Sequence, residues 1–129
     1  APTAPAGTNT TQVATTAFVQ AAAARPYKVY TALLSQIGNA APTATVLENT
    51  LGGTVVWARS SAGIYSGSLL NAFDLSKTFL SVLDIGANSN SRTVCVVSNI
   101  SSILLATSVS GTGTDSLINR TSIEIRVYL

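Results

Sequence analysis

The alternation that decides the fold is IEIRVYL, residues 123–129, at the end of the chain. In an extended strand its odd-numbered apolar residues face one way, and Glu124, Arg126 and Tyr128 face the other. Successive side chains of a strand point to opposite sides of a sheet. The stretch therefore predicts a half-buried strand, with its isoleucines in a core.

The same two-residue period recurs upstream, in short stretches separated by turns rich in Gly, Asn and Ser. The expected strands run from residue 27 to before Gly38 and over residues 43–49, 54–59, 64–70, 78–85, 93–97 and 103–109. Together with the last stretch they make about eight strands at a spacing of roughly ten residues, which is typical of sandwiches. We therefore predict a mainly β chain, an antiparallel β-sandwich that is jelly-roll-like, although a closed barrel gives the same pattern.

Several side chains and segments have expected places in such a sandwich. Trp57 is expected to fill the core, and Arg59 is expected to leave the core at an edge. Phe73 is expected to cap the core from a loop. The nearly continuous apolar run at residues 93–97 predicts a strand buried on both faces. The Gly- and Thr-rich residues 110–115 predict a flexible tip.

One stretch departs from the period of two and predicts a helix over residues 9–25. Asn9 is a suitable N-cap, and Pro26 ends the run. Arg25 is expected to complement the negative end of the helix dipole. The apolar stripe is narrow, and a helix of roughly 15 residues is marginal in water on its own. The helix must therefore dock on something or associate with copies of itself through its stripe, which consists of Ala14, Ala17, Phe18 and Ala21.

The remaining divisions follow from composition. Residues 1–8 carry two prolines and a glycine and predict an extended linker. Residues 27–129 make one β domain, because 129 residues are too few for two sizeable cores. The chain begins at Ala1 without a methionine, so we expect a processed product or a fragment of a longer protein.

The segment TQVATTAFVQ, residues 11–20, together with the Ala-, Pro-, Thr- and Gly-rich residues before it, resembles a segment of bacteriophage tail-fibre and related virion-fibre proteins. In that family the segment leads from a repetitive shaft into a C-terminal trimeric domain. The stretches KVYTALL, residues 28–34, and ENTLGGTVVW, residues 48–57, are similar to small β-rich head domains at fibre ends. The resemblance implies a homotrimer in a virion, joined to other virion proteins through its N-terminal side and binding a host surface glycan or protein.

Only 9% of the residues are charged, so Ser, Thr, Asn and Gly must form most of the surface, as is common in extracellular and virion proteins. The net charge of +2 is scattered singly along the chain, so we expect no nucleic-acid binding. No apolar run approaches the ~18 residues that span a bilayer, and we expect no membrane insertion. The single cysteine, Cys95, is expected to be a buried small hydrophobe.

Catalytic chemistry has few carriers in this chain. Histidine is absent, which removes the commonest general base and metal ligand. The five carboxylates show no spacing typical of a metal loop or an acid/base pair, and we expect neither an enzyme nor a cofactor or metal site. A glycosidase can assemble two carboxylates from distant strands, so the sequence leaves that alternative open.

A binding role is the remaining class. The candidate contacts to a host receptor are Tyr65, Asn88, Asn90 and Arg92, an aromatic residue and three hydrogen-bonding residues. One alternative is a capsid-attached head fibre, spike or decoration protein, which the sequence does not separate from a tail fibre. Another is a carbohydrate-binding module of a secreted protein, which needs an aromatic platform although Trp57 is expected to be internal.

Overall fold

The structure is a computed structural model that describes residues 5, 16–83 and 90–129, apart from the side chains of Phe18 and Ala22. Several expected features therefore lie outside the described residues. They are most of the linker 1–8, the N-cap Asn9, the helix contact Ala14, the side chain of Phe18 and the receptor candidate Asn88.

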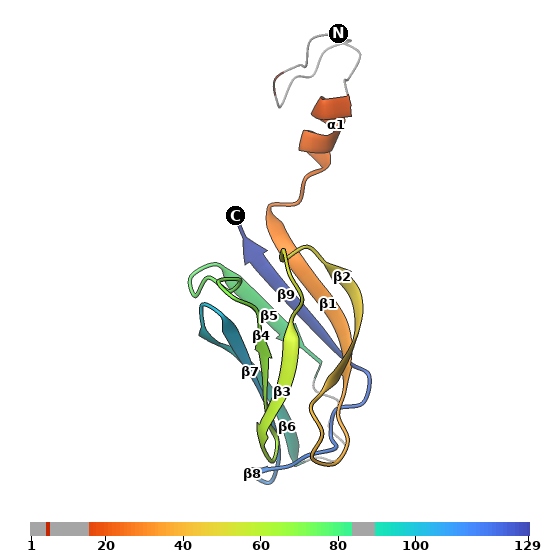
Figure 1. Cartoon of the computed structure of the whole chain (residues 1–129), viewed down its shortest axis with the longest axis vertical. Coiled ribbons are helices and arrows are strands. Elements are labelled where there is room, and N and C mark those ends of the chain that lie inside the picture. The colour runs from red at the N-terminus through yellow and green to blue at the C-terminus, as the bar shows by residue number, and fades with distance from the viewer. Residues whose placement is uncertain (1–4, 6–15, 84–89) are drawn as a thin grey trace.

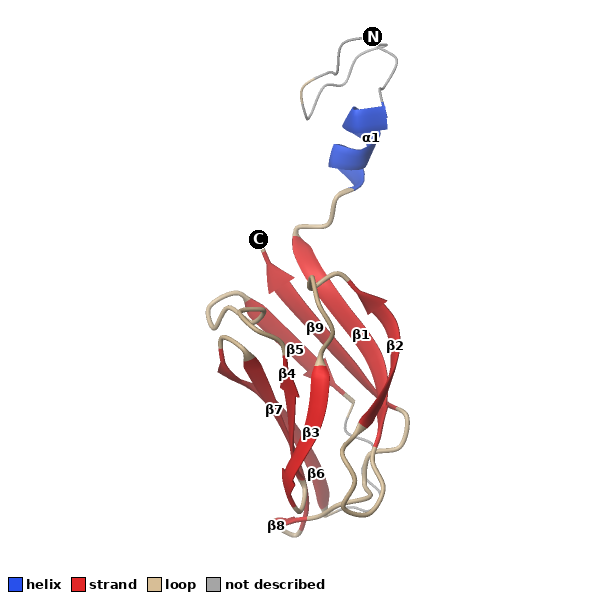
Figure 2. Cartoon of the chain, in the orientation of Figure 1, coloured by secondary structure: helices blue, strands red, loops and turns tan. Residues whose placement is uncertain are grey.

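The described part of the chain contains one helix and nine strands, and the strands form two antiparallel sheets (Figure 1, Figure 2). The first sheet has the order β2-β1-β9-β5, and the second has the order β3-β4-β7-β6 with β8 beside β7. The expected mainly β, sandwich-like fold is confirmed. The elements are α1 (Thr16–Ala23), β1 (Tyr27–Ser35), β2 (Thr43–Asn49), β3 (Val56–Ser61), β4 (Ile64–Ser68), β5 (Thr78–Val82), β6 (Ser91–Asn99), β7 (Ser102–Val109), β8 (Thr112–Gly113) and β9 (Thr121–Tyr128).

The C-terminal strand β9 occupies the position that its alternation predicts. It pairs with β1 on one side and with β5 on the other, so Ile125 lies opposite both Tyr30 and Leu80. Ile123 and Ile125 are buried, while Glu124 and Arg126 are partly exposed on the opposite side. A strand with neighbours on both edges and one apolar face is the centre of a half-buried sheet.

The core fills the space between the two sheets. Tyr30, Tyr65, Leu105 and Ile125 are each almost completely buried. Phe73 closes this core from the segment between β4 and β5, as predicted, and is also fully buried. Burying a large apolar or aromatic side chain contributes about 1.5–3 kcal/mol, so these buried residues stabilise the sandwich.

The β3–β4 hairpin also follows the prediction. Trp57 is buried in the core, and its indole N–H donates to the hydroxyl of Tyr30 at 3.2 Å. Val56 and Ala58, which alternate with Trp57, are exposed. Arg59 leaves the core near the end of this edge strand, where it forms an ion pair with Asp115.

The prediction that residues 93–97 form a doubly buried strand is wrong. They belong to β6, an edge strand of the second sheet, and Val96 is 45% exposed. The interior strands of this sheet are β4 and β7, and in β7 Ile103, Leu105 and Thr107 are buried. Within the described part of the chain no further layer covers β6, so its apolar run has one side toward the core and the other toward solvent.

The described helix α1 is eight residues long and stands beyond the end of the sandwich where β1 begins and β9 ends (Figure 1). It ends at Ala23, so Arg25 is not in its last turn. Arg25 instead pairs with Glu48 at 2.7 Å, and the prediction that it complements the helix dipole is wrong. An ion pair with a full carboxylate charge is stronger than the interaction of a cation with the partial charge at a helix end.

Candidate functional site

Two parts of the sandwich carry polar or aromatic groups in organised positions. The first is the outward side of the β2-β1-β9-β5 sheet, which we call the outer face. The side chains on it that are at least partly exposed include Tyr27, Thr31, Leu33, Leu47, Glu48, Phe79, Ser81, Leu83, Ser122, Glu124, Arg126 and Tyr128. The second lies at the opposite end from α1, and we call it the tip clamp; it consists of Gln36, Arg59, Tyr65 and Asp115.

Aromatic rings gather around an arginine at the α1 end of the outer face. Tyr27 lies opposite Tyr128 in the β1–β9 ladder, and their ring centroids are 5.2 Å apart at an interplanar angle of 55°. The guanidinium of Arg126 lies 4.8 Å from the Tyr27 centroid and 6.0 Å from the Phe79 centroid. Cation–π contacts of this kind hold the arginine and the rings together.

The charges of this cluster are neutralised within the chain. Arg126 forms an ion pair and hydrogen bond with Glu124, two residues earlier on the same side of β9. Hydrogen bonds to Tyr128 and Glu124 raise the pKa of the Arg126 guanidinium. The neighbouring side chains of Arg25 and Glu48 also neutralise each other as an ion pair. The outer face therefore offers cations and anions that already have partners.

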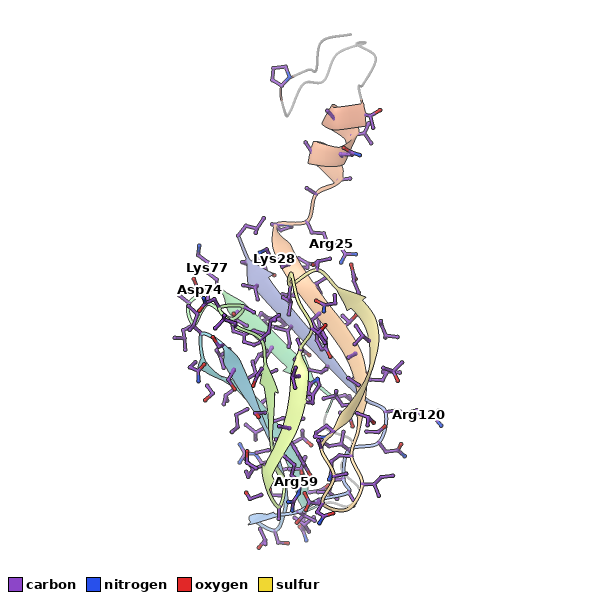
Figure 3. The ribbon with its side chains drawn as sticks, viewed as in Figure 1. Arg25, Lys28, Arg59, Asp74, Lys77 and Arg120 are labelled. Carbon is purple, nitrogen blue, oxygen red and sulfur yellow. The ribbon has the colours of Figure 1, made fainter. Side chains whose placement is uncertain are left out.

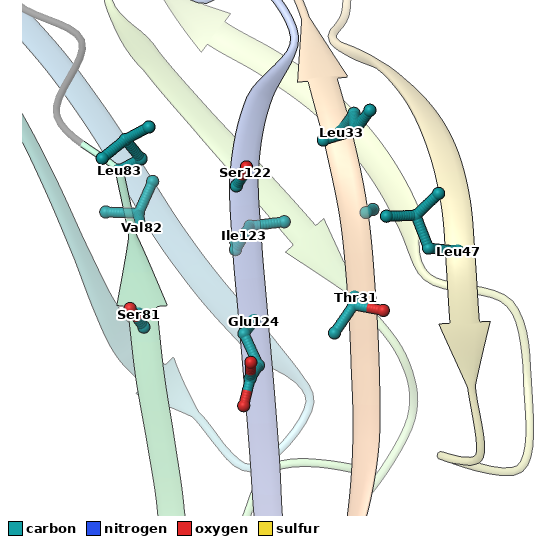
Figure 4. A pocket seen from close by; sticks show the side chains of 10 residues that line it. Thr31, Leu33, Leu47, Ser81, Val82, Leu83, Ser122, Ile123 and Glu124 are labelled. Atoms are coloured by element: carbon teal, nitrogen blue, oxygen red, sulfur yellow. The ribbon is translucent and has the colours of Figure 1, made fainter.

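A shallow apolar groove continues the outer face toward the other end of the sheet (Figure 4). It encloses about 270 Å³ and is bordered by Leu33, Leu47 and Leu83, with Ser122 and Glu124 between them. A β-bulge produces part of this shape, because Thr31 pairs with Glu48 while the next residue pairs with Val46. Leu47 is the extra residue of the bulge and is 64% exposed.

The composition of the outer face suits binding. Aromatic residues, arginine and aliphatic side chains are the types enriched at protein interfaces. Leu47, Phe79 and Leu83 are each more than half exposed, and Tyr128 is 40% exposed. Large apolar patches on one side of a domain usually mark an interaction surface.

The tip clamp is a polar network around the carboxylate of Asp115. Arg59 donates to it through Nε and Nη2, with the shortest contact at 2.6 Å, and the backbone N–H of Gly63 donates at 3.0 Å. These donors hold the pKa of the Asp115 carboxyl well below its usual range. The hydroxyl of Tyr65 lies 2.8 Å from the same carboxylate.

Gln36 joins a second loop to this network. Its Nε2 donates to the carbonyl oxygens of Gly38 and Ala40, which orients Oε1 toward the interior. That oxygen accepts from the N–H of Ser116 at 2.7 Å and lies 2.9 Å from the Tyr65 hydroxyl. The single hydroxyl proton of Tyr65 is thus shared between an amide and a carboxylate.

Two physical effects act on the Tyr65 hydroxyl. Burial, followed by the hydrogen bond to Asp115, raises its pKa to about 12. The clamp joins β3, β4 and the segments after β1 and β8. Over a wide pH range the Asp115 carboxylate stays ionised and the Tyr65 hydroxyl stays neutral. Figure 3 shows Arg59 at this end, and Arg25, Lys28 and Lys77 at the end near α1.

The structure separates the sequence-predicted receptor contacts. Tyr65 is fully buried, so the prediction that it contacts a receptor is wrong. Asn90 and Arg92 are exposed, and the carbonyl of Asn90 accepts from the N–H of Ser110 at 2.9 Å. The predicted flexible tip at residues 110–115 instead contains β8 and ends in the clamp at Asp115.

Two of the predicted helix contacts lie in the described part of the chain with their side chains. Ala17 and Ala21 are both exposed on α1.

Sequence reasoning missed the cluster around Arg126, although the alternation in β9 already put Arg126 and Tyr128 on one side. It also missed the pairing of Arg59 with Asp115, because the two residues are 56 positions apart and no local pattern joins them.

Within residues 5, 16–83 and 90–129, no three His, Cys, Asp or Glu side chains come together in a way that could hold a metal ion. The helix in that part of the chain is too short to cross a membrane. Comparison with protein-family models, with curated proteins and with solved structures finds no significant match.

Proposed function

We propose that the chain is the C-terminal part of a bacteriophage fibre or spike, which assembles as a homotrimer and attaches the virion to its host. The proposal rests on the family resemblance of residues 11–20 and on the character of the two surfaces. The chain acts by binding and carries out no catalysis. Its virion side is the α1 end, and its host side is the tip.

The observation that carries the homotrimer is the exposure of α1. Every side chain of Thr16–Ala23 whose exposure is described lies in solvent, and Val19 is 54% exposed. An isolated helix of this length is unstable in water. Copies of the same helix can cover its small residues, since Ala17 and Ala21 allow close approach.

The tip supports the host-binding role. The clamp joins loops from distant parts of the chain, so the surface that they present is held in one arrangement before a ligand arrives. Preorganised loops bind with a smaller loss of conformational entropy. Exposed groups at this end include Ile37, which is 79% exposed, Asn90 and Arg92. Asn90 and Arg92 remain the proposed receptor contacts, with Asn88 beside them in the sequence.

The location on a particle is tested by electron microscopy of virions labelled with gold-coupled antibodies against this chain. We expect label at the outer ends of tail fibres or spikes. Label on the capsid would instead support the head-fibre or decoration alternative. Particles without label, combined with glycan binding by a stable monomer, would refute the virion role and favour a carbohydrate-binding module.

A further inference from the structure

We propose that the outer face of the β2-β1-β9-β5 sheet is covered by a second copy of this chain in the assembled protein. The inference rests on the proposed homotrimer and names the surface that makes it. The helices alone do not explain why Leu47, Phe79 and Leu83 lie in solvent on one side of one sheet.

Chain connectivity favours a second copy as the occupant. Only residues 24–26 separate α1 from β1, and the four residue steps from Ala23 to Tyr27 span at most about 14 Å. Helices that pack together lie about 8–10 Å apart. The first residues of β1 in neighbouring copies are therefore held within roughly 40 Å of one another. Since β1 lies inside the sheet, between β2 and β9, association of the helices brings this sheet toward the shared axis.

The charges of the face fit the same partner. Arg126 has Glu124, and Arg25 has Glu48, so a neutral surface can cover these groups and leave no ion unpaired. A strongly charged partner, such as an acidic polymer, would find no excess of positive charge here. The chain itself is only 9% charged, so another copy presents the nearly neutral surface that the face requires.

The size of the face explains why α1 is part of the same assembly. Four strands about 4.8 Å apart and about seven residues long, at ~3.3 Å per residue, give roughly 450 Å² in projection. A stable interface buries about 800 Å² on each partner. The outer face is therefore about half of what stable association needs, and contacts between helices must supply most of the rest. Both surfaces are required together.

Charge substitutions on the exposed side chains of the full chain test the inference. Leu47→Glu and Leu83→Glu place a charge where the proposed partner lies, and Val56→Glu is the matched control on the other sheet. The three wild-type side chains are 64%, 57% and 62% exposed, respectively, so each glutamate is solvated in a monomer. Sedimentation equilibrium over a range of concentrations measures association, and circular dichroism measures folding.

We expect Leu47→Glu and Leu83→Glu to weaken association at least 100-fold, while Val56→Glu associates like the wild type. Wild-type affinity in both outer-face variants would overturn the inference and leave the homotrimer standing. A wild type that is monomeric at every concentration would instead refute the proposed homotrimer and the inference with it.

Hydroxyl-radical footprinting of the wild type gives a second readout that does not depend on variant folding. Phe79 and Tyr128 are expected to be oxidised several-fold more slowly in the trimer than in dilute monomer, while the outward Val56 changes little. Equal oxidation of Phe79 and Tyr128 in both states would show that the face is free, and that a ligand other than a second copy has to be sought for it.

Discussion

Replacing Asp115 by Asn perturbs the tip clamp with almost no change in side-chain volume. The carboxylate accepts hydrogen bonds from Arg59, from the N–H of Gly63 and from the hydroxyl of Tyr65. An asparagine keeps one acceptor oxygen and introduces an N–H₂ group that faces donors. Arg59 then loses its counter-ion.

The magnitude follows from the burial of the pair. Removing one partner of a fully buried ion pair costs about 3–5 kcal/mol, and a hydrogen bond to a charged group contributes about 1.5–3 kcal/mol. The side chains of Arg59 and Asp115 are 23% and 18% exposed, so water recovers part of the loss. We expect Asp115→Asn to lower the free energy of unfolding by about 2–3 kcal/mol. For a chain of this size that corresponds to a fall in Tm of roughly 6–12 °C.

Denaturant unfolding measures the change at a protein concentration at which the chain is monomeric, so that no second copy covers the Arg25–Glu48 pair, and Glu48→Gln is the control. The Arg25–Glu48 pair has the same chemistry, but its side chains are 53% and 38% exposed. Exposed pairs contribute between about 0 and 1 kcal/mol, so the control should lose less than half as much as Asp115→Asn. Equal losses in the two variants would refute the reasoning that burial makes the clamp a stabilising element.

The same variant has a signature in acid. The folded state holds the pKa of Asp115 well below its usual range, whereas the unfolded chain titrates near pH ~3.9. The stabilisation is fully present above that pH and is lost as pH falls toward the folded pKa. The stability difference between wild type and Asp115→Asn should therefore shrink below about pH 4. A difference that stays constant down to pH 2 would contradict the assignment.

Three further predictions concern single positions. Gly63→Ala should prevent stable folding, because its Cβ would lie 2.1 Å from the carbonyl oxygen of Thr107. Gly111→Ala meets no atom within 4 Å and should lower the free energy of unfolding by only about 1 kcal/mol, through its positive φ. Thermal unfolding compares the two variants. The wild type should lose stability between about pH 10, where an unfolded tyrosine ionises, and the folded pKa of Tyr65, which is about 12. Tyr65→Phe should not show this loss, and urea titration at several alkaline pH values compares the two proteins. Burial raises the pKa of the Cys95 thiol to about 11, so a thiol reagent at pH 8 should react at least ten-fold faster in denaturant than with the folded chain.

The strands were largely predictable because half-buried strands repeat a period of two. β1, β2 and β9 follow the expected ranges closely, and the segment with Phe73 enters the core as expected. The exposure of β6 was not predictable in this way. Its apolar run resembles a central strand, but its place at a sheet edge depends on long-range pairing with β7.

The site was harder to predict than the fold. The inward side of β4 carries Tyr65 and Gly67, and glycine gives no hydrophobic signal. A Cβ on Gly67 would lie 3.1 Å from the Trp57 ring and 3.1 Å from Ile103, so the glycine leaves room for close packing. The alternation therefore did not show that Tyr65 faces the core. Asp115 was part of a segment whose composition predicted only a loose tip.

The outer-face cluster combines a predictable part with an unpredictable one. The alternation in β9 puts Arg126 and Tyr128 on the same side. The rings of Tyr27 and Phe79 come from β1 and β5, and only the sheet order places these strands on either side of β9. Sequence patterns report which side of a strand a residue occupies, but they do not report its neighbours across the sheet.

The central claim is that this chain works as a homotrimer, and its mass in solution tests that claim most directly. One chain has a mass of 13.2 kDa, so sedimentation equilibrium of the full chain at micromolar concentration should give three times that value, about 40 kDa. A single species of 13.2 kDa over the whole concentration range would contradict the account, because α1 and the outer face would then have no partner.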